Sequence, residues 1–143
     1  MSLGNTFEND LVKLIFNATA IANIADNAAS APLTNLYMSL HIADPGEAGD
    51  QTTSEIAYTG YARVQVARTS GGWTVSTNTA VPVANVDFGA KTAGTDATAT
   101  YCVVGTASSG TGKILLSGAI SPTISVTNGV TPRLTTATTI TFD

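Results

Sequence analysis

The chain has 143 residues, of which 43% are hydrophobic and only 11% charged, and its net charge is −4. A chain this apolar is not disordered, and its length is typical of one domain, so we expect a single domain over residues 1–143. The acidic balance argues against nucleic acid as a partner, no apolar run is long enough to cross a membrane, and the single cysteine cannot form a disulfide within the chain.

Residues 5–29 are predicted to form an N-terminal helix, because their apolar residues recur at spacings of three and four. Glu8 and Asp10 fall in the first turn, where the helix dipole favours negative charge. The stripe can pack on the chain's own domain, which is the simpler interpretation, or dock on a neighbouring subunit. The stripe consists of Phe7, Leu11, Leu14, Ala18, Ile21 and Ala25.

From residue 35 onward the apolar period changes to two, which is typical of half-buried strands. Asn128 and Gly129 form a two-residue hairpin signal between two of these strands. This pattern predicts a mainly β fold, a jelly-roll-like sandwich over residues 35–143 behind the N-terminal helix. The predicted strands are 36–42, 61–68, 73–75, 80–88, 97–105, 113–119, 122–127, 130–134 and 138–142.

The segment GTASSGTGKI, residues 105–114, is similar to a phosphate-binding loop but departs from that pattern at two positions. Ala107 occupies the place of the first glycine, and Ile114 occupies the place of the magnesium-binding hydroxyl. The residues that follow are typical of a strand and not of a helix, so no helix N-terminus faces a phosphate. We expect a hairpin turn.

Few other residues are candidates for chemistry. His41 lies on the polar face of a predicted strand, where we expect a surface or interface histidine and no metal site or catalytic triad. Cys102 is expected to act as a small apolar residue in an apolar strand. Asp87 and Asp96 could be the two carboxylates of a glycosidase, but the sequence offers no aromatic platform for a sugar near them, and Trp73 is the only tryptophan. We therefore expect no catalytic residue, no metal and no cofactor.

Residues 44–60 form a polar loop that carries four carboxylates and is followed by two arginines. The carboxylates could hold Ca²⁺, but a solvated or subunit-facing loop is the simpler interpretation. The arginines could form ion pairs between subunits or remain solvated. Together with the helical stripe, these residues are our candidates for an interface: Phe7, Leu11, Leu14, Ile21, Asp44, Glu47, Asp50, Glu55, Arg63 and Arg68.

Three segments carry a resemblance to a known family: YMSLHIADPGEAGDQTTSEIAYTGYARVQVAR (residues 37–68), GGWTV (71–75) and YCVVGTASSGTGKILLSGAI (101–120). Through them, most of the chain resembles small virion proteins of tailed bacteriophages. Such proteins are often labelled tail-fibre proteins, and some are similar to capsid cement (decoration) proteins, which have a jelly-roll fold and lie as oligomers on the outer shell.

The resemblance implies a virion structural protein with no catalytic motif. The first expectation is a capsid cement protein on the capsid exterior, which binds the major capsid protein and itself as a homodimer or homotrimer. The alternative is a tail-fibre or baseplate-associated protein that contacts the host surface, and a small glycan-processing enzyme is a distant third. Neither nucleic acid nor a membrane is an expected partner.

Overall fold

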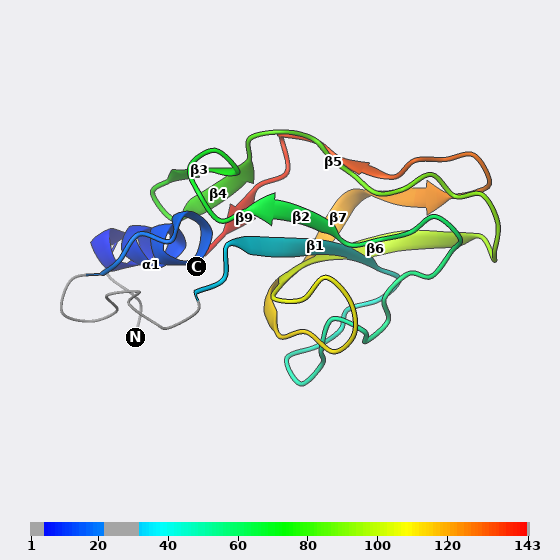
Figure 1. Ribbon diagram of the computed structural model, residues 1–143, viewed down its shortest axis with the longest axis horizontal. Helices are drawn as coiled ribbons and strands as arrows, with labels where there is room; N and C mark the ends of the chain where they lie inside the picture. The colour runs from blue at the N-terminus through cyan, green and yellow to red at the C-terminus, as the bar shows by residue number, and fades with distance from the viewer. Residues whose placement is uncertain (1–4, 22–31, 143) are drawn as a thin grey trace. The chain divides into compact units, whose positions relative to one another are not determined.

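In the computed structural model the described residues are 5–21 and 32–142, with the side chains of Asn5 and Phe7 excepted, and they form a mainly β protein with one N-terminal helix (Figure 1). This confirms the predicted fold class. The described residues contain no helix that is long and apolar enough to cross a membrane. The elements are α1 (Asn5–Asn17), β1 (Asn35–His41), β2 (Val64–Ala67), β3 (Trp73–Ser76), β4 (Thr79–Pro82), β5 (Val86–Asp87), β6 (Ala97–Gly105), β7 (Ile114–Val126), β8 (Arg133–Leu134) and β9 (Ile140–Thr141).

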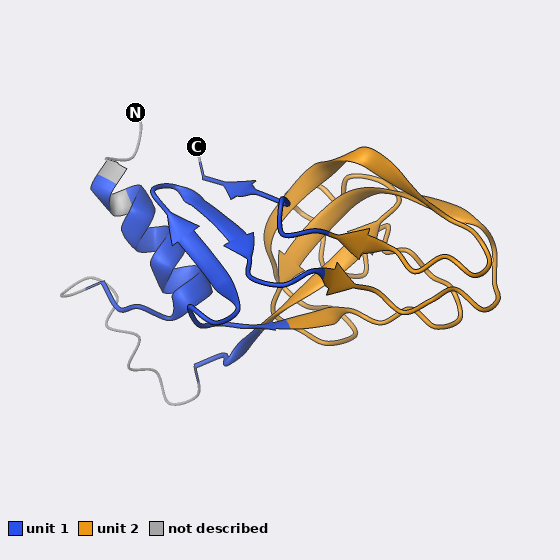
Figure 2. Cartoon of the chain, turned by 90° about the horizontal axis from the view of Figure 1, so that it is seen from above, with its two compact units in different colours: residues 1–35, 66–85, 135–143 blue, residues 36–65, 86–134 orange. Residues whose placement is uncertain are grey.

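The chain divides into two compact units, coloured separately in Figure 2. Unit 1 comprises residues 1–35, 66–85 and 135–143, and unit 2 comprises residues 36–65 and 86–134. The prediction of a single domain over 1–143 stays a prediction.

Helix α1 ends at Asn17, so the prediction of a helix to residue 29 is wrong for residues 18–21, and the rest of that range lies outside the described residues. Ala18 adopts a left-handed backbone conformation (φ 53°), and the Thr19 N–H donates to the Lys13 carbonyl. Arg68 donates to the carbonyls of Leu14 and Ile15, which a continuing helix would have used for its own hydrogen bonds. The helix therefore stops although its apolar pattern continues.

The core of unit 1 forms between α1 and the β3–β4 hairpin. Val12 and Phe16 are fully buried, and the Phe16 ring meets the buried Trp73 edge to face with 4.5 Å between ring centroids. Leu11 and Leu14 are only half-buried, so the predicted stripe is not the face that packs most tightly. The buried side chains follow the next line of residues around the helix.

Unit 2 is built on most of a four-stranded sheet with the order β2-β1-β6-β7. β6 runs antiparallel to both of its neighbours, and its bounds match the predicted strand 97–105. The predicted strands 113–119 and 122–127 are joined in β7, although the register breaks between Ala119 and Ile124 so that residues 120–123, which include the cis Ser121–Pro122 bond, lie opposite Thr100 alone. The predicted strand 80–88 is instead divided into β4 and β5.

The hairpin predicted at Asn128-Gly129 is wrong. The turn itself forms, since Gly129 has φ 84° and the Val130 N–H donates to the Thr127 carbonyl. However, β7 pairs with β6, whereas β8 pairs with β5. Non-local hydrogen bonds, such as Lys91 N–H to the Val130 carbonyl, outweigh the local hairpin preference.

Tyr61 links the β5 region to β1 in a sandwich-like arrangement within unit 2. Its ring stacks on Phe88, just after β5, with 6.1 Å between centroids, and its hydroxyl accepts a hydrogen bond from the Leu40 N–H. Leu40, Phe88 and Met38 are fully buried, so this is the apolar core of the unit.

Candidate functional site

His41 is fully buried, which corrects the expectation of a surface or interface histidine. Its Nδ1 lies 2.8 Å from the Thr53 carbonyl oxygen, and its Nε2 lies 2.9 Å from the Ser39 hydroxyl. A carbonyl can only accept, so Nδ1 carries the hydrogen and Nε2 accepts from the Ser39 hydroxyl. Residues 54–56 run antiparallel to the end of β1, where the Ile56 N–H donates to the Leu40 carbonyl and the Ile42 N–H donates to the Ser54 carbonyl.

The Ser39–His41 pair has the hydrogen bond of a nucleophile and its general base. Both side chains are completely inaccessible to solvent, however. A substrate cannot reach the Ser39 hydroxyl in this conformation, so the pair ties residue 53 to β1 and offers no reactive surface.

Burial lowers the pKa of His41 below its ordinary value of 6.5, and the nearby Arg63 acts in the same direction, while the Thr53 hydrogen bond and Glu55 oppose the shift. Above pH 6.5 the histidine is neutral in both folded and unfolded chains. Below it, only the unfolded chain takes up the proton until the pH reaches the lower folded pKa. The free energy of unfolding should therefore fall as the pH falls from 6.5 through the folded pKa.

Urea unfolding of the wild type and of His41→Gln, measured between about pH 7.5 and about pH 5, tests this linkage. The variant should be less stable at the upper pH but should lack the step that the wild type shows. An NMR titration midpoint for His41 above 6.5 would contradict the expected direction.

Arg63 and Glu55 form a bidentate ion pair within the chain, with Nε–Oε1 and Nη2–Oε2 distances of 2.7 Å. Their side chains are 3% and 16% exposed, so the pair is neither solvated nor open to another subunit. Tyr61 donates from its hydroxyl to the same Glu55 carboxylate. The carboxylate raises the pKa of Arg63, and burial raises the pKa of Tyr61.

The loop of residues 106–112, which we call the clamped loop, connects β6 to β7 and confirms the predicted turn at the GTASSGTGKI segment. Arg63 donates to the carbonyls of Ala107 (3.0 Å) and Gly110 (2.9 Å). The fully buried Gln51 side chain accepts from the Ala107 N–H through Oε1, and the Gln51 backbone N–H donates to the Gly112 carbonyl. Residues 108–111 at the tip are exposed.

Gln51 also explains the glycines that made this segment similar to a phosphate loop. A Cβ at Gly105 would lie 2.1 Å from the Gln51 Cδ, and one at Gly112 would lie 2.0 Å from its Oε1. Both glycines therefore make room for a buried side chain and leave no cradle for a phosphate. The Gln51 Nε2 has no hydrogen-bond partner among the described residues.

The other carboxylates of the acidic loop remain at the surface. Asp44 and Glu47 are exposed and Asp50 is half-exposed. Hydrogen bonds from the Thr52 hydroxyl and amide lower the pKa of Asp50. Among the described residues no group of three His, Cys, Asp or Glu side chains is placed to hold a metal ion.

The remaining sequence candidates are dispersed. Asp87 pairs with Arg133, which lowers its pKa, and Asp96 pairs with the buried Lys91, so each acid of the suggested glycosidase pair has its own cation. Burial raises the pKa of Cys102 to about 11, which leaves its thiol protonated and unreactive. Among the interface candidates, Arg68 donates hydrogen bonds to carbonyls of α1 within the chain. Ile21 is buried, with 8% of its surface exposed.

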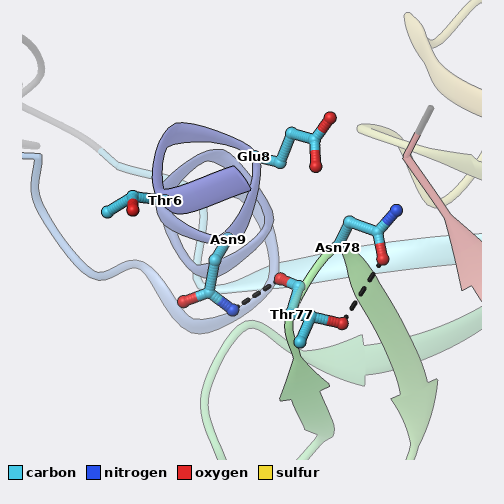
Figure 3. Close-up of a pocket in the computed structure, with 5 residues that line it drawn as sticks. All are labelled: Thr6, Glu8, Asn9, Thr77 and Asn78. Carbon is cyan, nitrogen blue, oxygen red and sulfur yellow. Dashed lines mark hydrogen bonds between the residues drawn. The ribbon is translucent and has the colours of Figure 1, made fainter. Parts of the chain in front are cut away.

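A shallow pocket in unit 1 lies between the start of α1 and the β3–β4 turn (Figure 3). The Asn9 amide donates to the Thr77 carbonyl, the Asn78 amide donates to the Phe142 carbonyl, and Thr6 and Glu8 complete the lining. Both amide groups that line the pocket therefore already donate to backbone carbonyls within the chain.

The sequence matches the family described as podophage GP4 fiber I protein gp80 over residues 2–142. The chain belongs to this family. A search of curated proteins found no match to it. Membership makes the protein a virion structural protein of a tailed bacteriophage, as the resemblance in the sequence implied.

Sequence reasoning missed Gln51, Tyr61 and Ser39, which complete the buried polar contacts of this family member. Ser39 and His41 are two residues apart on one strand, so their shared face was a usable signal. Gln51 and Tyr61 carried none, because their partners are 56 and 21 residues away in the chain.

Proposed function

We propose that the protein is a tail-fibre or baseplate-associated structural component that contacts the host surface or a neighbouring tail protein. The observation that carries the proposal is the family match, whose description names a fibre protein and covers nearly the whole chain. We place this function ahead of the capsid cement protein that was our first expectation. The role is structural and not catalytic.

The clamped loop supports a contact function. A buried ion pair contributes little net stability compared with apolar packing, so its presence calls for another role. Here Arg63 and Gln51 fix backbone groups of Ala107 and Gly110 and hold an exposed tip in one shape. A loop that is already ordered loses less entropy on binding, which favours a binding surface at residues 108–111.

Localisation of the protein on purified virions tests the proposal. Antibody labelling viewed by electron microscopy should mark the tail, and gel densitometry should give few copies per particle. Labelling distributed over the capsid with many copies per particle would refute the fibre assignment and favour a cement protein bound to the major capsid protein.

A further inference from the structure

The outer edge of β7 carries hydrogen-bonding groups that no described strand uses. β7 is the last strand in the order β2-β1-β6-β7, so one of its edges bonds to β6 while the other pairs with no strand among residues 5–21 and 32–142 (Figure 1). A free strand edge is a template for another strand, because its N–H and C=O groups alternate in the spacing of a ladder. The chemistry of the edge therefore selects a β-strand as its occupant.

Residues 114–119 are the usable part of this edge. They follow β6 from Gly105 to Tyr101, with one extra residue at Leu115. Beyond Ala119 the register breaks, and Pro122 has no N–H to offer a ladder. Pairing with another strand would thus be confined to residues 114–119.

This edge lacks the charges that usually prevent edge-to-edge association. No charged residue occurs from Ile114 through Pro132, although the chain has a net charge of −4. The exposed carboxylates Asp44 and Glu47 belong to a different loop. Two copies of an acidic protein repel each other least where both surfaces are uncharged. The exposed Lys113 directly precedes this segment, whereas the other terminal strand, β2, has only four residues and is flanked on both sides, by Arg63 and Arg68.

We propose that two copies of this chain associate by antiparallel pairing of residues 114–119 across a twofold axis. A twofold interface places the same strand on both sides, so the strand must be complementary to itself. An uncharged strand with small outward residues meets this condition. Ser117 and Ala119 are exposed, so a partner strand can approach them. This inference does not depend on whether the protein lies on the tail or on the capsid.

Light scattering coupled to size-exclusion chromatography tests the proposal over a range of protein concentrations. The wild type should form a dimer, and the double variant Ser117→Glu/Ala119→Glu should be a monomer, because the two copies would then carry four carboxylates within one pairing segment. The matched control Thr123→Glu/Ser125→Glu adds the same charge at exposed positions of β7 outside the pairing segment and should remain dimeric. A monomeric wild type, a dimer that survives the first pair of changes, or a control that also dissociates would overturn the proposal.

Hydrogen exchange provides a second measurement that needs no variant. The amides of residues 114–119 on the outer edge should exchange more slowly at high than at low concentration of the wild type. Concentration-independent exchange in this segment would overturn the proposal even if the variants failed to fold, which circular dichroism would reveal.

Discussion

Replacement of Arg63 by methionine is expected to lower the free energy of unfolding by about 3–5 kcal/mol, the cost of breaking a buried ion pair from one side. The change leaves the Glu55 carboxylate, which is 16% exposed, without its cation. It also removes the donors to the carbonyls of Ala107 and Gly110. Urea unfolding followed by circular dichroism at neutral pH measures the loss.

Two controls separate burial from charge in this experiment. The double variant Glu55→Gln/Arg63→Met should regain part of the lost stability, since a neutral amide then replaces the carboxylate that lost its cation. Arg133→Met breaks the exposed pair with Asp87 and should leave stability nearly unchanged, because water screens that pair. Equal losses in Arg63→Met and Arg133→Met would show that the Glu55 pair has no special role.

Phe16→Ala should destabilise the protein by about 3–5 kcal/mol, as expected when a fully buried aromatic side chain is removed and leaves a cavity. Phe16 has no exposed surface, and its ring packs edge to face on the Trp73 ring with 4.5 Å between the two ring centroids. Trp73 is the only tryptophan, so its fluorescence should shift to longer wavelength as water enters the site. Urea unfolding by both fluorescence and circular dichroism gives the two readings.

Leu14→Ala is the matched control on the same helix. Leu14 belongs to the predicted stripe but is only half-buried, so its truncation should cost clearly less than that of Phe16. A larger loss for Leu14 than for Phe16 would mean that the predicted stripe, and not the Val12 and Phe16 face, carries the packing of α1.

Local sequence patterns predicted the parts of helices and strands that depend least on residues far away in the chain. The apolar run of β6 was predicted with its observed bounds, and the start of α1 was predicted from its acidic first turn and spacing. The end of α1 was not, because Arg68 lies 53 residues from the Ile15 carbonyl that it occupies. The helical spacing of apolar residues continues in the sequence beyond the residue at which a distant side chain ends the helix.

The same limit applied to the candidate site. Alternation along β1 correctly separates His41 from Leu40, and such a pattern predicts that His41 faces water. The histidine is nevertheless fully buried, and its ring makes hydrogen bonds to the Ser39 hydroxyl and the Thr53 carbonyl. Likewise, the sequence shows the glycines Gly105 and Gly112 beside the tip of the clamped loop. It does not show why they are needed, because the Gln51 side chain that they make room for comes from a distant part of the chain.

The sequence by itself determined the fold class, the periodicity of most strands, the turn between β6 and β7 and the resemblance to phage virion proteins, because each depends on neighbouring residues or on a quoted motif. Only the tertiary structure decided which strands pair, where α1 ends, and that His41, Gln51, Glu55 and Arg63 are committed inside the chain. The reason is physical: hydrogen bonds and burial between residues far apart in sequence outweigh local preferences once the backbone brings them together.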